Sequence, residues 1–242
     1  MGSHPVCGRP LYGWASLGER RRSKVRSSRF GWIRVAVCAI ALLPAALEPI
    51  AAQEEGDTGG QRFLAAQSPE LVTRLFEKRT LLLEEVERAD GGTLFVAYVL
   101  FDQPRSRVVA LLTEPGRQRE YRPELCKVKV IESGENTRLD ENQLKVMFTK
   151  LVYRVRYVSE LDQEPQRLSW KLDPSFDNDV TRLEGSWELY ELDAENTVGR
   201  FGSIVDVGAV PQIVQDILSR KTVVNTVENT RYWVDSDGKW RP

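Results

Sequence analysis

Histidine is almost absent from this sequence of 242 residues, and its one occurrence is His4. The rest of the chain therefore has no imidazole for a Ser–His–Asp triad, for a general base or for a histidine-ligated zinc site. Acid–base catalysis would fall to Asp, Glu, Tyr, Lys or Arg side chains. We predict no catalytic residue, no metal site and no cofactor, and enzymatic activity is an open but disfavoured interpretation.

A hydrophobic run long enough to span a bilayer is also lacking. The apolar run over 35–47 is broken by Pro44 and is shorter than the roughly 20 residues that a spanning helix needs. Basic residues precede this run, and the small residues Ala51 and Ala52 follow it. These are the three parts of a secretory signal. We therefore expect a signal peptide over 1–52, cleaved near Ala52, and export to the periplasm or cell envelope; an uncleaved membrane tether is the alternative.

Acidic residues outnumber basic ones after residue 52. Of the 34 Lys and Arg and the 35 Asp and Glu residues, eight and two lie in the first 52, so the remainder carries a net charge of about −7. An acidic domain is a poor candidate for nucleic-acid binding or for electrostatic attachment to anionic lipid. We expect a single domain with a sizeable core, monomeric, with at most transient membrane contact.

The segment that follows the leader changes character at Ser68. Residues 53–67 are polar and glycine-rich, which predicts a flexible linker. Ser68-Pro69-Glu70 supplies an N-cap, a proline at the first helical position and an acid in the first turn, so a helix is predicted over 69–79. An Asp-Gly-Gly turn precedes the β-branched and aromatic run 93–101, which favours a hairpin. Residues 68–92 are thus an N-terminal helix and strand extension.

The central part of the chain is predicted to be mostly β-strand. Apolar spacing favours a short helix over 105–113, followed by a second helical turn. Residues 125–207 then show runs of period-two alternation, as in antiparallel strands. The alternation slips near 149–150, which indicates a bulge or tight bend. One face of each strand is apolar and the other polar, so we expect a sheet covered on one side only.

The end of the sequence contains its clearest amphipathic helix. Apolar residues recur every 3.6 positions from Val210 to Val227, and Pro211 lies in the first turn,. A helix ending near Val234 would be roughly 36 Å long, enough to cross a whole curved sheet. Residues 236–242 are predicted to be a C-terminal tail.

In chain order these elements are a strand, two short helices, about six antiparallel strands and one long helix. Local stretches also resemble a known family: Phe101-Asp102-Gln103-Pro104 with Val108-Val109-Ala110-Leu111-Leu112-Thr113, Tyr121-Arg122-Pro123-Glu124-Leu125, Leu168-Ser169-Trp170-Lys171-Leu172 and Glu184-Gly185-Ser186-Trp187-Glu188-Leu189. Over about 93–235 the sequence is similar to the START-like or SRPBCC superfamily, in its polyketide cyclase and coenzyme-Q-binding branch. The resemblance implies an α+β helix-grip fold, in which a curved antiparallel sheet wraps around the long C-terminal helix.

The resemblance also implies a cavity between sheet and helix that holds a hydrophobic small molecule, such as a lipid, a quinone or a polyketide-like compound. Concave apolar pockets are where small ligands bind. The candidate ligand-binding residues are Phe148, Tyr153, Trp170 and Trp187 on the sheet and Val214 and Ile217 on the helix. Large aromatic side chains can equally fill a solid core.

Two alternatives to a binding protein stay open. One is an interaction or scaffold domain of the same fold that holds no ligand. The other, least favoured, is a cyclase or dehydratase. An inward-facing carboxylate or tyrosine with a raised pKa in an apolar pocket would favour this last interpretation.

Overall fold

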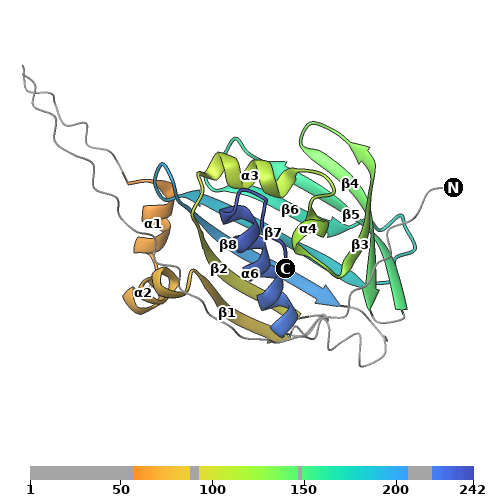
Figure 1. Cartoon of the computed structure of the whole chain (residues 1–242), viewed down its shortest axis with the longest axis horizontal. Coiled ribbons are helices and arrows are strands. Elements are labelled where there is room, and N and C mark those ends of the chain that lie inside the picture. Colours follow the sequence, from red (N-terminus) through yellow and green to blue (C-terminus); the bar gives the residue numbers. More distant parts are fainter. Residues whose placement is uncertain (1–56, 88–92, 147–148, 207–219) are drawn as a thin grey trace, which may run out of the picture. The chain divides into compact units, whose positions relative to one another are not determined.

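The computed structural model describes residues 57–87, 93–146, 149–206 and 220–242. Within them, one antiparallel sheet has the strand order β1-β2-β8-β7-β6-β5-β4-β3, and α3, α4 and α6 lie across one of its faces (Figure 1). The predicted α+β helix-grip fold is confirmed. Among the described residues, no helix is both long and apolar enough to cross a membrane.

The bounds of the elements follow the predicted order. The strands are β1 (Thr80–Glu87), β2 (Thr93–Phe101), β3 (Leu125–Ser133), β4 (Thr137–Val146), β5 (Thr149–Glu160), β6 (Gln166–Leu172), β7 (Arg182–Glu191) and β8 (Thr197–Asp206). The helices are α1 (Gly59–Ala65), α2 (Pro69–Lys78), α3 (Arg105–Thr113), α4 (Gln118–Tyr121) and α6 (Arg220–Asp235). The slip predicted at 149–150 lies where the chain reverses from β4 to β5, since Val146 pairs with Thr149.

Strand β2 is buried on both faces, and two cores meet there. Ala97, Val99 and Phe101 join one core with residues of α3 and α6. Val96, Tyr98 and Leu100 join a second core with Leu64 of α1 and Leu75 of α2. The expectation of a sheet covered on one side only is therefore wrong at β2, because α1 and α2 cover its other face.

Helix α1 lies inside the segment predicted to be a flexible linker over 53–67, so that prediction is wrong for Gly59–Ala65. Thr58 and Gln61 form a capping box: the Thr58 amide donates to Gln61 Oε1 at 2.9 Å, and the Gln61 amide donates to Thr58 Oγ1 at 3.3 Å,. Gly60 is needed for packing, because a Cβ there would lie 2.6 Å from the carbonyl oxygen of Glu191. Gly60 therefore allows α1 to pack closely against the end of β7 and does not mark a flexible segment.

Helix α6 ends at Asp235, one residue beyond the predicted end at Val234. Its buried apolar side chains, Val227, Trp233 and Val234, pack against the core that contains Val99 of β2. The predicted start at Val210 lies outside the described residues.

Replacing Leu75 by alanine should show that α2 is part of the folded core. Leu75 is fully buried, at 0% exposure, so its truncation should cost about 2–5 kcal/mol of unfolding free energy. Phe76 on the same helix is 48% exposed, and Phe76→Ala should change stability by less than about 0.5 kcal/mol. Urea unfolding of both variants measures the difference. Equal effects would mean that α2 does not dock on the sheet.

Candidate functional site

The sheet face that meets α3, α4 and α6, here called the inner face, is built by cross-strand register. Trp187 lies opposite Leu168 on one side and Phe201 on the other, and Tyr157 lies opposite Trp170. Further inner-face residues are Val99, Phe101, Leu189, Tyr153, Val155, Asn142, Asp140 and Arg138. The inner face is thus aromatic across β6, β7 and β8 and becomes polar on β4.

Aromatic rings form the apolar part of this face. The ring centroids of Trp187 lie 5.8 Å from Phe101 and 5.0 Å from Phe201, and Trp170 lies 5.7 Å from Phe201. Trp170 is half-buried and packs against both the α6 core and the β3–β5 core. A Cβ at Gly185 would lie 2.5 Å from the Trp170 ring, so glycine allows this ring to pack closely against β7.

Three of the six predicted ligand-binding residues are described, and all three are on the inner face. Tyr153 and Trp187 are 2% and 7% exposed, and Trp170 is half-buried. The other three, Phe148, Val214 and Ile217, lie outside the described residues. Contact of Tyr153, Trp170 and Trp187 with a ligand stays a prediction.

A polar patch interrupts the inner face near β4, and sequence reasoning did not find it. Its members are Gln118, Arg122, Glu124, Arg138, Asp140 and Asn142. Asp140 is fully buried, and Arg138 Nε donates to both of its carboxylate oxygens, at 2.9 and 3.0 Å. The Arg138 guanidinium also lies 4.8 Å from the Tyr157 ring centroid and donates to the carbonyl oxygen of Thr113, at the end of α3. Arg138 therefore joins β4 to α3.

Burial is the largest single influence on the pKa values of the patch. It raises the pKa of the Asp140 carboxyl, and Arg138 opposes the shift only in part,. Burial also raises the pKa of Tyr153 to about 12. For Arg122, burial pulls the guanidinium pKa down, but Glu124 and nearby tyrosines outweigh it, and the pKa is raised. Arg122 Nε donates to Glu124 at 3.2 Å, so the patch contains two charge-balanced pairs.

Two polar amides complete the patch. Gln118 of α4 is buried and accepts a hydrogen bond from the Tyr157 hydroxyl at 3.3 Å. Asn142, which faces Tyr153 across the β4–β5 ladder, is 2% exposed, and its Oδ1 receives no hydrogen bond from any described residue. An unpaired buried acceptor is unusual in folded proteins.

A pocket of about 250 Å³ opens onto the inner face beside this patch. Leu112 and Pro115 line it from the α3 side, and the β3–β4 turn at 133–137 lines the opposite side. Arg138, Tyr157 and Leu168 also line it. The pocket therefore connects solvent with the place where aromatic and polar parts of the inner face meet.

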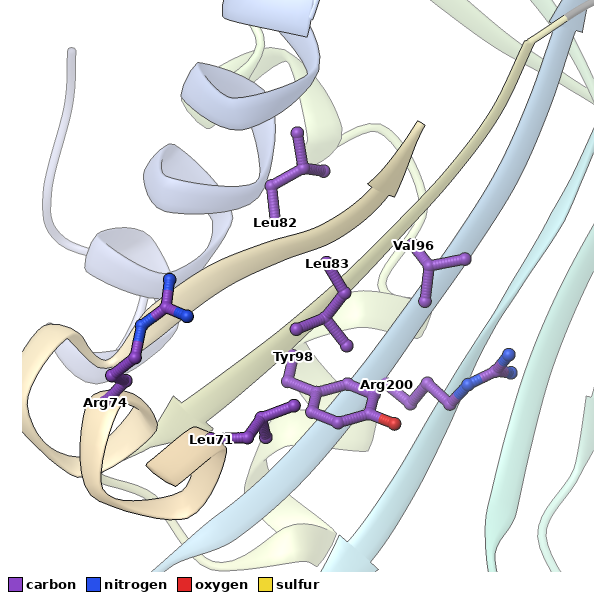
Figure 2. Close-up of a pocket in the computed structure, with 7 residues that line it drawn as sticks. All are labelled: Leu71, Arg74, Leu82, Leu83, Val96, Tyr98 and Arg200. Atoms are coloured by element: carbon purple, nitrogen blue, oxygen red, sulfur yellow. The ribbon is translucent and has the colours of Figure 1, made fainter. Parts of the chain in front are cut away.

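A second pocket, of about 500 Å³, is a groove on the opposite face of the sheet. Leu71 of α2 and Leu83, Val96 and Tyr98 of the strands line it (Figure 2). Arg74 and Arg200 lie at its two sides and do not converge on one point in Figure 2. Despite its size, this groove has no converging polar groups among the residues that line it, and we place the candidate site on the inner face.

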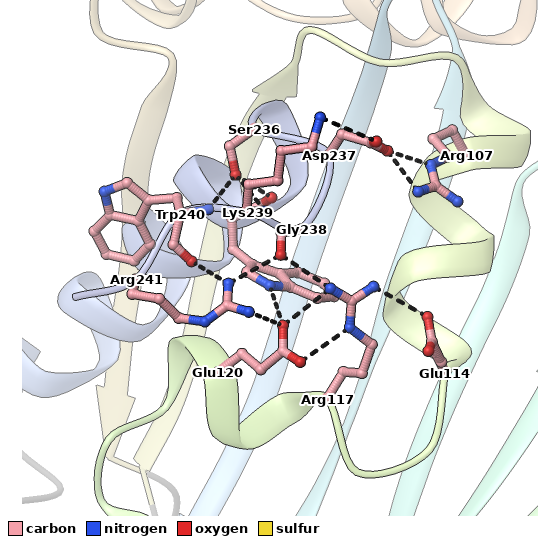
Figure 3. A network of polar contacts seen from close by, with 11 residues as sticks. Arg107, Glu114, Arg117, Glu120, Ser236, Asp237, Gly238, Lys239, Trp240 and Arg241 are labelled. Atoms are coloured by element: carbon pink, nitrogen blue, oxygen red, sulfur yellow. Dashed lines mark hydrogen bonds and ion pairs between the residues drawn. The ribbon is translucent and has the colours of Figure 1, made fainter.

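Helix α4 is held over the inner face by the C-terminal segment (Figure 3). Glu120 Oε2 accepts hydrogen bonds from Trp233 Nε1 of α6 at 3.0 Å and from Arg117 Nη2 at 3.0 Å, and forms an ion pair with Arg241 at 2.7 Å. Hydrogen bonding from Arg117 is the main cause of the lowered pKa of Glu120. The carbonyl oxygen of Gly238 accepts from both Arg117 and Arg241, at 2.9 Å each.

Residues 236–242, predicted to be a tail, thus make ordered contacts with α3 and α4. Asp237 and Gly238 have φ angles of 58° and 74°, which turn the chain back after α6,. Arg107 Nε of α3 donates to Asp237 at 2.6 Å. A Cβ at Gly238 would lie 2.5 Å from Arg117 Nη2, and the positive φ at this position favours glycine,.

Metal binding finds no support in the part of the chain that the structure describes. There, no group of three or more His, Cys, Asp or Glu side chains could hold a metal ion. The polar patch offers instead hydrogen-bonding groups beside an apolar surface, which suits the recognition of an amphipathic molecule.

Comparison with known proteins defines the fold. No protein-family model matches the chain, and no curated protein matches it. The structure is similar to a STAR-related lipid transfer protein fragment from Xanthomonas axonopodis, with a TM-score of 0.51 and 14% identity over 64% of this chain and 98% of the other. It is also similar to human StAR-related lipid transfer protein 5, with a TM-score of 0.51 and 11% identity over 74% and 97%. The chain therefore has the START-like helix-grip fold.

Replacing Gly185 by alanine should disturb the aromatic surface. Its Cβ would lie 2.3 Å from the carbonyl oxygen of Gly202 and 2.5 Å from Trp170, so we expect a loss of about 1–3 kcal/mol in unfolding free energy. Gly202→Ala is the matched control, because no described atom lies within 4 Å of its Cβ position. Thermal and urea unfolding should separate the two; indistinguishable variants would contradict the packing of Trp170 on β7.

The raised pKa of Asp140 predicts a definite pH dependence. Because the folded state holds the Asp140 proton more tightly than the unfolded state, this group's contribution to stability falls as pH rises from its ordinary pKa through the raised one. Asp140→Asn cannot titrate. Its stability relative to wild type should therefore increase as the pH rises above about 4, measured by urea unfolding. A decrease would mean that pairing with Arg138 outweighs burial.

Proposed function

We propose that this protein binds a hydrophobic small molecule between the inner face and helices α3, α4 and α6, and does not transform it. The observation that carries the proposal is the pocket between α3 and the β3–β4 turn, which opens onto Arg138, Tyr157 and Leu168. Leu168 and Trp170 continue the apolar surface from there. A lipid, a quinone or a polyketide-like molecule has the apolar body that such a surface would bury.

The small volume of the pocket favours a ligand that is elongated or only partly enclosed by the pocket. Its volume of about 250 Å³ is slightly below the usual range of small-molecule pockets, which is roughly 300–1,000 Å³. The similar structures from Xanthomonas axonopodis and human are described as lipid transfer proteins. That description agrees with the proposal for this chain, although identities of 14% and 11% carry the fold alone.

We further propose that the protein acts in the cell envelope as a monomer. The basic leader with its short apolar run and small-residue end at Ala51 and Ala52 supports export,. The acidic balance of the rest of the chain supports at most a transient contact with a membrane surface. Carriage, sensing and sequestration of the ligand are each compatible with this placement.

An enzymatic role has one observation in its favour. Asp140 is an inward-facing carboxyl with a raised pKa, which is typical of acid–base catalysts,. Its exposure, however, is 0%, and both of its oxygens already accept from Arg138. The Asp140 carboxylate is thus engaged in an ion pair with Arg138, and ligand binding without chemistry is the better-supported function.

Native mass spectrometry of the protein purified from its own host's envelope, with a solvent extract analysed in parallel, tests the proposal. We expect a retained apolar molecule. Leu112→Trp, which adds bulk at the pocket lining, should lose most of the occupancy, since the pocket is small. Phe76→Trp, on the exposed side of α2, is the control and should retain it.

An empty wild-type protein that also ignores a panel of lipids and quinones would contradict the proposal. It would favour an interaction domain with a solid core, an interpretation that the low exposure of Tyr153 and Trp187 would then support.

A further inference from the structure

The unsatisfied Asn142 amide indicates which chemistry the ligand's polar end carries. Asn142 points from β4 to the same face as Tyr153 of β5, its cross-strand partner. Both side chains are 2% exposed. Asn142 Oδ1 is buried and receives no hydrogen bond from any residue in the described ranges. Buried acceptors are rarely left unpaired, because the lost hydrogen bond to water is not replaced. A donor from outside the chain would satisfy it.

The other polar groups of the patch are already engaged. Asp140, two positions earlier on β4, is bound by Arg138, and the Tyr157 hydroxyl donates to Gln118. Glu124 is paired with Arg122. Asn142 Oδ1 is therefore the acceptor that these neighbours leave open, and none of them supplies the donor that it lacks.

The charge balance of the patch restricts the ligand further. Arg138 is matched by Asp140, and Arg122 is matched by Glu124, at distances between 2.9 and 3.2 Å. A carboxylate or phosphate entering this enclosed region would add a negative charge with no free cation to match it, which is costly in a low-dielectric interior. A neutral polar end avoids that cost.

The apolar residues clustered with Tyr153 indicate that the rest of the ligand is apolar. Leu125, Leu144 and Val155 form a buried cluster with Tyr153, and Trp170 packs against that cluster. Arg138, which lines the pocket, lies four residues from Asn142 along β4, or roughly 13 Å in an extended strand. An amphiphile that enters at the pocket and binds the amide would need an apolar chain of about ten carbons to cover this distance.

We propose that the ligand is a neutral amphiphile with a hydroxyl or similar hydrogen-bond donor at its polar end, and that Asn142 Oδ1 accepts this hydrogen bond. Asn142 is then a residue that determines specificity. The inference rests on the proposed function, because it concerns the polar end of a ligand bound on the inner face.

A comparison of two matched probes tests this assignment. A long-chain primary alcohol and its methyl ether have nearly the same apolar body, but only the alcohol donates a hydrogen bond. With wild-type protein stripped of ligand, we expect the alcohol to bind about 5-fold more tightly, the worth of one ordinary hydrogen bond. The fatty acid of the same length should bind more weakly than the alcohol at neutral pH. Isothermal titration calorimetry gives the three affinities.

Asn142→Leu should abolish the preference for the alcohol while retaining the folded structure, since leucine has a similar volume and no unpaired oxygen. Gln166→Met is the matched control: Gln166 Oε1 also lacks a hydrogen bond from the described residues, but it lies on β6 opposite Leu189. This variant should keep the wild-type preference.

Each outcome has a distinct meaning. Equal affinities of wild type for alcohol and ether, or a preference that survives in Asn142→Leu, would overturn the role of Asn142 while leaving the proposed function intact. Failure of all three probes to bind wild type would overturn the proposed function as well. The wild-type comparison decides the donor requirement even where Asn142→Leu does not fold.

Discussion

The burial of β2 on both of its faces is the constraint on which the rest of this structure depends. Val99 and Phe101 face α3 and α6, while Tyr98 and Leu100 face α1 and α2. Because successive side chains of a strand point to opposite faces, these two cores cannot move independently. The strand therefore holds α3 and α6 over the inner face. The candidate site lies between the end of α3 and the β3–β4 turn.

Polar side chains at the border of the apolar inner face connect the sheet and the helices to one another. Arg138 connects β4 with the end of α3, and Glu120 connects α4 with Trp233 of α6. Together they hold the two short helices at a defined position above the sheet. The energy for this placement comes from charge-assisted hydrogen bonds in partly buried surroundings, which are stronger than bonds between neutral groups. An apolar face closed by a polar border is suited to amphipathic molecules.

The order of elements could be predicted from the sequence because each strand alternates clearly and the turns carry glycine, proline and acids. The inner-face positions of Tyr153, Trp170 and Trp187 follow from that alternation. Helix α1 was missed because Gly60 was interpreted as flexibility, although it allows close packing on Glu191. The polar patch was missed because strand β4 carries Asp140 and Asn142 in the same phase as Leu144. The polar residues at strand positions that the alternation assigns to the apolar face were the signal from which the patch could have been predicted.

The central claim is that a ligand lies between the inner face and the helices, and photo-crosslinking tests it most directly. A long-chain alcohol with a diazirine in its chain would be bound, irradiated and mapped by peptide mass spectrometry. The account predicts labels on α3, β4, β5 and β6, competed away by unlabelled alcohol. Labels confined to α2 and β1, around the groove beside Arg74, would place the ligand on the opposite face and contradict it.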